Sequence, residues 1–179
     1  MKLELGKRIH VVGTTGSGKT TLAKDLSAKL DYPHVELDTL WWDPNWTNPS
    51  NEVFHQRVAQ ATSSDAWVVD GNYSRVRDIV WGQAETIIWL DFPLWLILFR
   101  LLQRTMRRLV TKEEIWNGNR ENFSNAFLSK ESLFVWAIQT YRRRKQQYLQ
   151  LLAEPKHSHL QQHRLTSPSE VQEFVSSID

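Results

Sequence analysis

The sequence of 179 residues contains no cysteine, so disulfide scaffolds, thiolate zinc sites and cysteine nucleophiles are excluded. It also lacks a long apolar run. The most apolar stretch, Ile87 to Phe99, contains Asp91 and Pro93 and is too short to span a bilayer. The opening residues, MKLELGKRIHVVG, do not include the apolar segment of a secretory signal. These absences predict a cytoplasmic protein with no membrane partner.

A strong surplus of one charge is missing too, because 22 lysines and arginines against 20 aspartates and glutamates leave a net charge of +2. A surplus this small does not by itself indicate a nucleic-acid or membrane partner. Hydrophobic residues make up 41% of the chain, which is ordinary for a globular protein of this length. We therefore expect a single domain over residues 1–179, present as a monomer or a homodimer.

One segment matches a motif with a well-defined chemistry. The run GTTGSGKT, from Gly13 to Thr20, fits the phosphate-binding loop G-x-x-x-x-G-K-[ST]. A strand-like run, Ile9 to Val12, precedes it, and a helical pattern begins at Thr21. In such a loop, backbone N–H groups turn inward around phosphates and the helix N-terminus adds partial positive charge. The motif predicts ATP and Mg²⁺ as ligands.

Within the loop, Lys19 is expected to reach the β- and γ-phosphates, and the Thr20 hydroxyl is expected to ligate Mg²⁺. The predicted nucleotide contacts of this segment are Gly13, Thr14, Thr15, Gly16, Ser17, Gly18, Lys19, Thr20 and Thr21.

Strand-like runs alternate with helical patterns along the chain, which predicts a parallel sheet covered by helices. The predicted strands are Arg8 to Val12, His34 to Leu37, Trp67 to Val69, Thr86 to Leu90, and a weak last strand near His163 to Leu165. With the phosphate loop, this pattern predicts an α/β protein: a P-loop NTPase with three layers, α/β/α, around a five-stranded parallel sheet.

Two regions stand apart from this alternation. Residues 41–66, rich in Trp, Asn and Pro, form an insertion that ends in a helix from about Ser50. Helices are also predicted for Leu94 to Val110 and for Glu131 to Leu152, on either side of a polar segment. We expect residues 105–145 to form a helical lid, in which Arg120 is a candidate phosphate contact.

The final helix has the clearest start in the chain. Ser167 can cap it, Pro168 suits its first turn, and Glu170 completes a capping box.

Four arginines form one face of the helix that follows the fourth strand, because Arg100, Arg104, Arg107 and Arg108 fall at i, i+4, i+7 and i+8. Guanidinium groups match phosphate oxygens bidentately, so this face predicts a phosphate clamp. The alternative is a solvated basic face, and for Arg107 and Arg108 both interpretations stay open. The later run from Arg142 to Lys145 cannot face one site on a helix, so at most two of its members contact nucleotide.

The order of these features is similar to that of small kinases of the adenylate, shikimate and gluconate type. These have a phosphate loop, an acceptor-binding insertion after the second strand and an arginine-bearing lid after the fourth. Arg100 lies seven residues beyond Pro93 and Arg104 four further on, which resembles the arginines at the base of the adenylate-kinase lid. Arg144 precedes Tyr148 by four residues, as the last lid-side arginine precedes a tyrosine in that family.

The run Leu165-Thr166-Ser167-Pro168 resembles the loop that lies against the adenine, which implies nucleotide contacts from Ser167 and Pro168. The phrases LDTLWW, WVVDGNYS, IIWLDFP, NGNRENF and HRLTSPSEV are similar to the family often labelled adenylate-kinase-related or topology-modulation (FlaR-like) proteins. The resemblance covers nearly the whole chain and implies a nucleotide-kinase-like fold that uses ATP.

Three aspartates end apolar runs: Asp38, Asp70 and Asp91. Such carboxylates lie where α/β sheets bind ligands. In related kinases the third strand lies beside the phosphate-loop strand, so we assign Asp70, with Thr20, to Mg²⁺. Asp38, at the end of the second strand, resembles the shikimate-kinase aspartate that faces the acceptor, and we expect it to orient or deprotonate a hydroxyl. Asp91 is expected to help start a helix.

Arg57 on the insertion helix and Arg75 after the third strand are placed to hold an anionic acceptor. The tryptophans of the insertion either stack on a base or sugar or pack the insertion against the sheet, and the sequence leaves both interpretations open. The predicted acceptor contacts are Asp38, Trp41, Arg57, Asp70, Gly71 and Arg75. The predicted catalytic residues are Lys19, Asp38, Arg100 and Arg104.

These features favour Mg²⁺-ATP-dependent phosphoryl transfer to a small-molecule acceptor, with a nucleotide or nucleoside ahead of a sugar acid. The segment that begins Asp70-Gly71-Asn72 places its arginine one residue later than adenylate kinases do, which argues against AMP. The alternative function is an ATP-dependent regulatory or nucleic-acid-binding protein without kinase activity. The sequence carries no guanine-reading N-K-x-D motif, which excludes the common GTPases.

Overall fold

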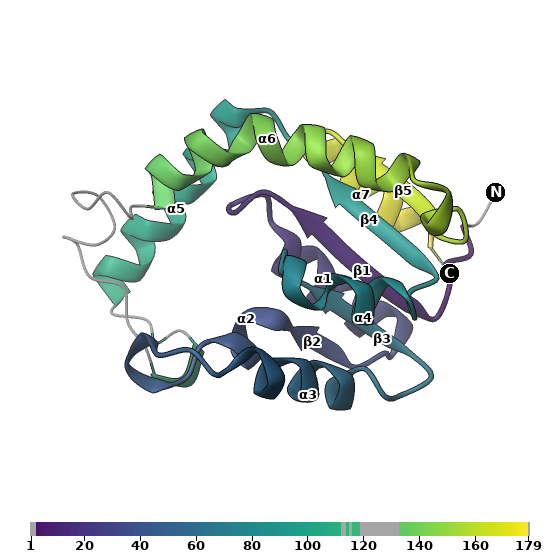
Figure 1. Cartoon of the computed structure of the whole chain (residues 1–179). Helices are drawn as coiled ribbons and strands as arrows, with labels where there is room; N and C mark the ends of the chain where they lie inside the picture. Colours follow the sequence, from purple (N-terminus) through teal and green to yellow (C-terminus); the bar gives the residue numbers. More distant parts are fainter. Residues whose placement is uncertain (1–2, 112–113, 115, 119–132, 179) are drawn as a thin grey trace.

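The computed structural model describes residues 3–111, 114, 116–118 and 133–178. At its centre lies a sheet of five parallel strands in the order β2-β3-β1-β4-β5 (Figure 1). The strands are β1 (Arg8–Gly13), β2 (His34–Glu36), β3 (Trp67–Asp70), β4 (Thr86–Leu90) and β5 (Gln161–Leu165). The predicted α/β class and five-stranded parallel sheet are confirmed, and the phosphate-loop strand β1 lies between β3 and β4.

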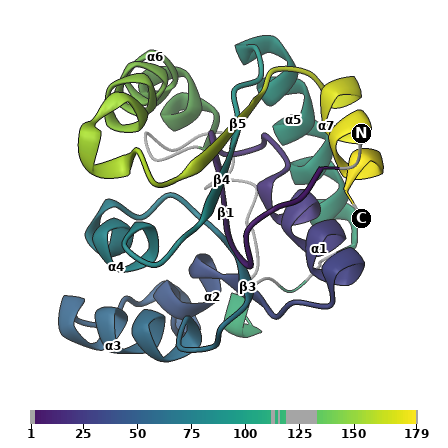
Figure 2. The ribbon, with the colours of Figure 1, turned by 90° about the vertical axis from the view of Figure 1, so that its right-hand side faces the viewer.

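Helices cover both faces of the sheet, which gives the three layers seen edge-on in Figure 2. One face is covered by α1 and α7, and the other by α3 and α4 with the C-terminal part of α6. The helices are α1 (Lys19–Leu30), α2 (Leu37–Trp41), α3 (Asn51–Ala61), α4 (Arg77–Trp81), α5 (Leu94–Thr111), α6 (Leu133–Ala153) and α7 (Pro168–Ser177), with short 3-10 turns η1 (Pro44–Trp46), η2 (Ser74–Val76), η3 (Trp116–Gly118) and η5 (Pro155–His157). Among the helices of the described ranges, none combines the length and apolar character needed to cross a membrane.

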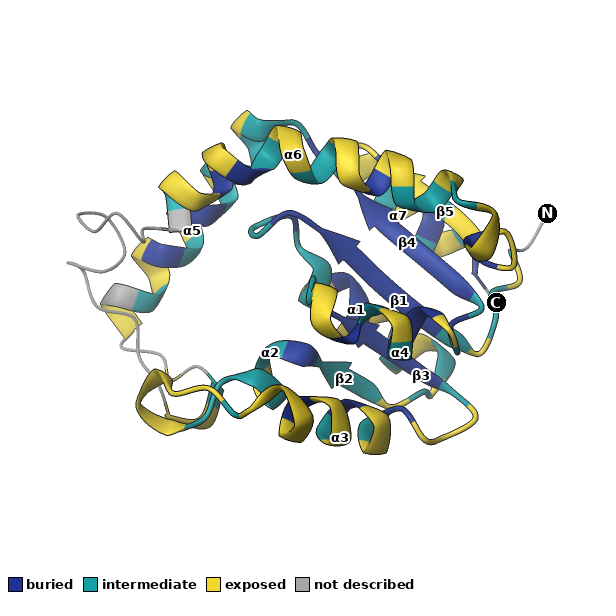
Figure 3. Ribbon diagram, viewed as in Figure 1, coloured by how far each residue is buried: buried dark blue, intermediate teal, exposed yellow. Residues whose placement is uncertain are grey.

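The core consists of two buried clusters, one on each face of the sheet. Val68 of β3 belongs to the cluster that contains Leu26 of α1. Its neighbours Trp67 and Val69 belong to the cluster that contains Phe54 of α3. Successive strand residues point to opposite faces, so one short apolar strand supplies both clusters. The central strands are accordingly buried along their length (Figure 3).

Two predicted helix starts are confirmed, and at each of them a serine caps the helix. The Ser50 hydroxyl accepts a hydrogen bond from the Val53 N–H at 3.3 Å, and α3 begins directly after it. The Ser167 hydroxyl accepts from the Glu170 N–H at 3.2 Å at the start of α7. Each bond satisfies one of the amides that the first turn of a helix leaves without a partner.

The structure corrects the prediction for the end of the second strand. The strand β2 ends at Glu36, and Asp38 lies in the first turn of α2 rather than at the strand end. The pairing of β2 with β3 stops where Glu36 meets Asp70, because β3 itself ends there. Beyond that point the chain has no neighbouring strand to pair with, and it turns into a helix. The short helices α2 and α4 were not predicted.

A buried histidine, His10, links β1 to the residue that follows β3 and to α4. His10 of β1 accepts a hydrogen bond at Nδ1 from the indole N–H of Trp81 at 2.8 Å, so its Nε2 carries the proton that the carbonyl of Gly71, 3.0 Å away, accepts. Burial lowers the pKa of His10 to about 4, although the bond to Gly71 opposes the shift. The neutral imidazole is therefore the form that the fold accommodates.

Stability should fall in acid because of this histidine. Above pH 6.5, His10 is neutral in both the folded and the unfolded chain. As the pH falls from 6.5 to about 4, the unfolded chain gains a proton that the folded chain does not, which costs about 3 kcal/mol of stability. Urea unfolding of the wild type, His10→Gln and the exposed control His55→Gln should show a flatter pH profile for His10→Gln alone. Equal slopes in all three would contradict this account.

Candidate active site

The loop between β1 and α1 is shaped to expose its backbone amides. Gly18 caps α1 in a left-handed conformation with φ of 94°, and it offers the amides of the first turn no side-chain cap. The Ser17 N–H bonds to the Thr14 carbonyl at 3.0 Å, which closes the turn. The Ser17 hydroxyl is buried and has no hydrogen-bond partner in the described part of the chain. Free amides and a buried hydroxyl at a helix N-terminus fit a polyphosphate.

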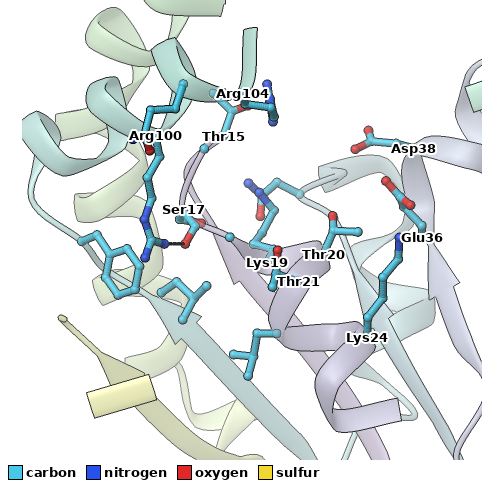
Figure 4. Close-up of a pocket in the computed structure, with 18 of the residues that line it drawn as sticks. Thr15, Ser17, Lys19, Thr20, Thr21, Lys24, Glu36, Asp38, Arg100 and Arg104 are labelled. Atoms are coloured by element: carbon cyan, nitrogen blue, oxygen red, sulfur yellow. Dashed lines mark hydrogen bonds between the residues drawn. The ribbon is translucent and has the colours of Figure 1, made fainter. Parts of the chain in front are cut away.

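The loop also packs directly on the arginine helix α5. Gly16 has φ of 79°, and a Cβ on it would lie 2.6 Å from Cγ of Leu101. A larger residue at position 16 would therefore push the loop away from α5. The Arg100 guanidinium donates to the Ser17 carbonyl at 2.9 Å and lies 5.0 Å from the Phe92 ring centroid (Figure 4). These contacts fix the loop relative to α5.

An asparagine that follows β3 fixes the start of the loop. The Asn72 side chain accepts from the Gly13 N–H at 3.2 Å, and its amide N–H donates to the Gly13 carbonyl. The hydroxyl of Tyr148 from α6 donates to the same Asn72 oxygen at 3.0 Å. Burial raises the pKa of Tyr148 to about 12, so it remains a donor at every relevant pH. Sequence analysis missed this clamp, although Asn72 stands just beyond a strand end where ligand-side residues are expected.

The loop borders a cavity of about 1340 Å³ at the carboxyl edge of the sheet. Its cationic lining residues are Lys19, Lys24, Arg100, Arg104, Arg107, Arg108 and Arg144. Both arginines for which two interpretations were open, Arg107 and Arg108, thus line the cavity. Drug-sized ligands usually occupy about 300–1000 Å³, so this cavity has room for a nucleotide and a second molecule.

Lys19 is half-buried between the loop and two carboxylates. Its ammonium donates to the Thr14 carbonyl at 3.3 Å. Burial lowers the pKa of Lys19 to about 8, while Asp70 and Asp38 oppose the shift. Lys19 and Asp38 point toward the same space from opposite sides in Figure 4. A cation held in this way can serve as a charge partner for a phosphate.

Thr20 and Asp70 are adjacent, as predicted for a magnesium site. The Thr20 hydroxyl donates to one oxygen of Asp70 at 3.0 Å, and Nε2 of His34 lies 2.7 Å from the other oxygen. Within the described residues, no group of three or more His, Cys, Asp and Glu side chains gathers as a metal site. A hydroxyl and one carboxylate fit Mg²⁺, which keeps several waters and takes phosphate oxygens rather than a full protein cage.

Asp38 lines the cavity even though it belongs to α2. Burial raises the pKa of Asp38, and a hydrogen bond donated by the Tyr73 hydroxyl opposes that shift. Burial, with the charge of Asp38, raises the pKa of Tyr73, which keeps its proton on the phenol. The phenol therefore orients the carboxylate toward the cavity.

Most of the predicted nucleotide contacts line the cavity. Those that do are Thr15, Gly16, Ser17, Gly18, Lys19, Thr20, Thr21, Arg144 and Pro168, joined by Asp38, Gly71, Arg100 and Arg104 among the other predicted site residues. Gly13 and Thr14 lie behind the lining and shape the loop, and Ser167 is engaged in capping α7. Arg120 lies outside the described residues.

Four predicted acceptor contacts do not line the cavity: Trp41, Arg57, Asp70 and Arg75. Trp41 packs against Phe54, with ring centroids 5.0 Å apart. The Arg75 guanidinium lies 4.8 Å from the Trp41 ring centroid, and Arg57 donates to Asp43 at 2.9 Å. The turn of α2 explains the position of Trp41, because it directs Trp41 to α3 and leaves the next residue, Trp42, to line the cavity. The packing interpretation therefore holds for Trp41.

Asp91 also has a different role from the predicted one. It pairs with Arg164 of β5, whose Nε lies 2.9 Å away, and with Lys145 of α6 at 2.9 Å. It therefore links the last strand to α6. The guanidinium of Arg144, the neighbour of Lys145, lies 4.2 Å from the Trp136 ring centroid. Arg144 and Trp136 both line the cavity.

Comparisons with known proteins give relatives and structures of similar fold. No family model matches the chain. A shikimate kinase from Synechococcus elongatus is 28% identical over 144 residues, covering 69% of this chain and 76% of its own. The structure is similar to a shikimate kinase from Bacteroides thetaiotaomicron, with a TM-score of 0.56, 14% identity and 94% of each chain covered. The chain has the fold of the P-loop kinases. A gluconokinase from Sinorhizobium meliloti 1021 gives a TM-score of 0.56 at 16% identity, covering 98% of this chain and 90% of its own.

Removing the asparagine clamp should loosen the phosphate loop of this P-loop kinase fold. Asn72→Ala leaves both backbone groups of Gly13 without their side-chain partner, so we expect about tenfold weaker ATP binding and a stability loss of about 1–3 kcal/mol. Calorimetric titration and thermal unfolding measure the two effects. Asn51→Ala, on the exposed side of α3, is the matched control. A folded Asn72→Ala protein that binds ATP like the wild type would show that the clamp is unimportant.

Proposed function

We propose that the protein transfers the γ-phosphoryl group of ATP to a hydroxyl of a small molecule, with Mg²⁺ as cofactor. One observation carries the proposal: the loop amides, Lys19 and the arginines of α5 and α6 line the same cavity as the carboxylate of Asp38. Charge for holding a polyphosphate and a group that accepts a proton are thus placed in one space. The similarity to shikimate kinases and a gluconokinase, which are small-molecule kinases by name, supports the same reaction class.

In the proposed reaction, the acceptor oxygen forms a bond to the γ-phosphorus while the bond from that phosphorus to the β,γ-bridging oxygen breaks. ADP leaves, and the hydroxyl proton passes to Asp38. Lys19 and Arg104 stabilise the negative charge on the phosphoryl oxygens. When bound, Mg²⁺ neutralises charge on the β- and γ-phosphates, held by Thr20 and by Asp70 directly or through water.

Arg100 has a positioning role in this proposal in addition to the predicted catalytic one. One of its nitrogens is committed to the Ser17 carbonyl, so it holds the loop whose amides face the phosphates. Its remaining N–H groups are available to the nucleotide side of the cavity that it lines. The pKa of Arg100 is lowered by burial but starts so high that the side chain stays charged.

The acceptor class we favour is a nucleotide or nucleoside, and the names of the relatives add shikimate and gluconate as candidates. The resemblance to adenylate-kinase-related, topology-modulation proteins stays a prediction. The alternative of an ATP-dependent regulatory or nucleic-acid-binding protein has less support, because the arginines of α5 line a cavity. Salt-sensitive binding to duplex DNA near physiological ionic strength would favour that alternative.

Replacing the loop lysine tests the proposed function. Lys19→Ala should lower phosphoryl transfer at least a hundredfold, because the charge on the transferring group loses its cationic partner. The measurement is ADP production against a panel of nucleosides, nucleoside monophosphates, shikimate and gluconate, with circular dichroism to confirm the fold. Lys29→Ala, an exposed residue in the last turn of the same helix, is the matched control. Undiminished turnover in Lys19→Ala would refute the assignment.

A further inference from the structure

Three tryptophans line one region of the cavity, and we call them the tryptophan corner: Trp42, Trp46 and Trp116. The rings of Trp42 and Trp46 meet edge to face, with centroids 5.3 Å apart and an interplanar angle of 81°. Trp46 and Trp116 meet at 6.3 Å and 84°. Trp46 remains 39% exposed and adopts φ of 57°, a conformation that bulky residues rarely adopt. The corner is therefore not part of either buried cluster and presents ring surface to the cavity.

Hydrogen bonds from Asn117, outside the insertion, and from Arg57, within it, hold the corner in place. The Asn117 amide donates to the carbonyls of Thr39, at 3.2 Å, and Trp42. On the other side, Arg57 donates to the Leu40 carbonyl and to Asp43, each at 2.9 Å. Ring surfaces that are fixed before a ligand arrives lose little conformational freedom when it binds.

A carboxylate contacts the corner. The indole N–H of Trp116 donates to Glu36 at 2.6 Å, and both residues line the cavity together with Asp38. Lys24 lies beside Glu36 and balances part of its charge (Figure 4). Carboxylate oxygens accept hydrogen bonds from hydroxyl and amino groups, and they repel phosphates and carboxylates.

The insertion supplies no arginine to the cavity. Arg57 is paired with Asp43, and Arg75 lies over Trp41, so neither of the two predicted anion contacts lines the space. The cations that do line it come from the phosphate loop, α1, α5 and α6. The aromatic rings and the carboxylates of Glu36 and Asp38 thus come from β2, from α2 and the insertion that follows it, and from η3, whereas the cations come from other elements that suit the nucleoside triphosphate.

From this separation we infer that the acceptor is an uncharged ribonucleoside. This inference rests on the proposed kinase function. The base of the nucleoside stacks in the tryptophan corner, and a ribose hydroxyl faces Asp38. Asp38 takes the hydroxyl proton as the hydroxyl oxygen bonds to the γ-phosphorus of ATP and ADP departs. Flat rings favour a base, and the carboxylates of Glu36 and Asp38 exclude a 5′-monophosphate or a sugar acid from the same end.

The test measures binding and turnover separately with the full-length protein. Calorimetric titrations use adenosine, guanosine, cytidine and uridine, their 5′-monophosphates, shikimate and gluconate, and mass spectrometry follows phosphorylation of each with Mg²⁺-ATP. At least one nucleoside should bind ten times more tightly than its own monophosphate and than either acid. A monophosphate or an acid that binds more tightly than every nucleoside overturns the inference, as does a complete absence of nucleoside binding.

Alanine variants of the corner test whether these rings bind the nucleoside. Trp42→Ala and Trp46→Ala should each weaken binding of the preferred nucleoside about five- to hundredfold, the range expected for losing a stacked base. Trp95→Ala is the matched control, because Trp95 is 69% exposed on α5 and does not line the cavity. Trp46 is exposed, so Trp46→Ala keeps the test valid if Trp42→Ala does not fold. Unchanged nucleoside affinity in a folded Trp46→Ala protein overturns the inference.

Failure of this inference can be told from failure of the proposed function. Phosphorylation of shikimate, gluconate or a monophosphate with no nucleoside turnover keeps the kinase and refutes the uncharged acceptor. Nucleoside binding that is lost in the corner variants, without phosphorylation of any compound, keeps the acceptor site and refutes the kinase.

Discussion

The backbone amides at the start of α1 impose the constraint on which the rest of the site depends. Within the part of the chain that the structure describes, they have neither a helical carbonyl nor a side-chain cap as partner, and their residues line the cavity. Their direction is set by Gly18 in a left-handed conformation and by Gly16, which packs against Leu101 without room for a side chain. Backbone N–H groups without a partner cost stability unless water or an anion accepts their hydrogen bonds. The loop is therefore preorganised to bind a polyphosphate.

The surrounding elements hold this loop from three directions. Asn72, after β3, bonds to both backbone groups of Gly13. Arg100, on α5, bonds to the Ser17 carbonyl. Tyr148, on α6, completes the contact to Asn72. The edge of the sheet, α5 and α6 thus all hold this one loop.

Sequence reasoning predicted the parts of the molecule that follow from local patterns. Strands, capped helices and the phosphate loop depend on neighbouring residues, and the structure has them within a few residues of the predicted bounds. The arginine face of α5 could be predicted because helical spacing alone brings Arg100 and Arg104 together. Asp70 and Thr20 meet because adjacent parallel strands end at the same edge.

Contacts that depend on the path of the insertion could not be predicted in this way. Whether Trp41 or Trp42 reaches the cavity depends on a five-residue helix that forms only because the sheet ends at Asp70. The capture of Arg57 by Asp43 depends on how the insertion folds back on itself. The link between Glu36 and Trp116 spans 80 residues, and no sequence spacing indicates it.

The central claim is that the amides between β1 and α1 enclose the polyphosphate of a nucleotide. The most direct measurement is a titration of ¹⁵N-labelled protein with Mg²⁺-ATP, in which the chemical shift of each backbone amide is followed. The account predicts that the largest shifts belong to Gly16, Gly18, Lys19 and Thr20. Saturation with ATP while these amides stay unchanged, with the main shifts elsewhere, would contradict it.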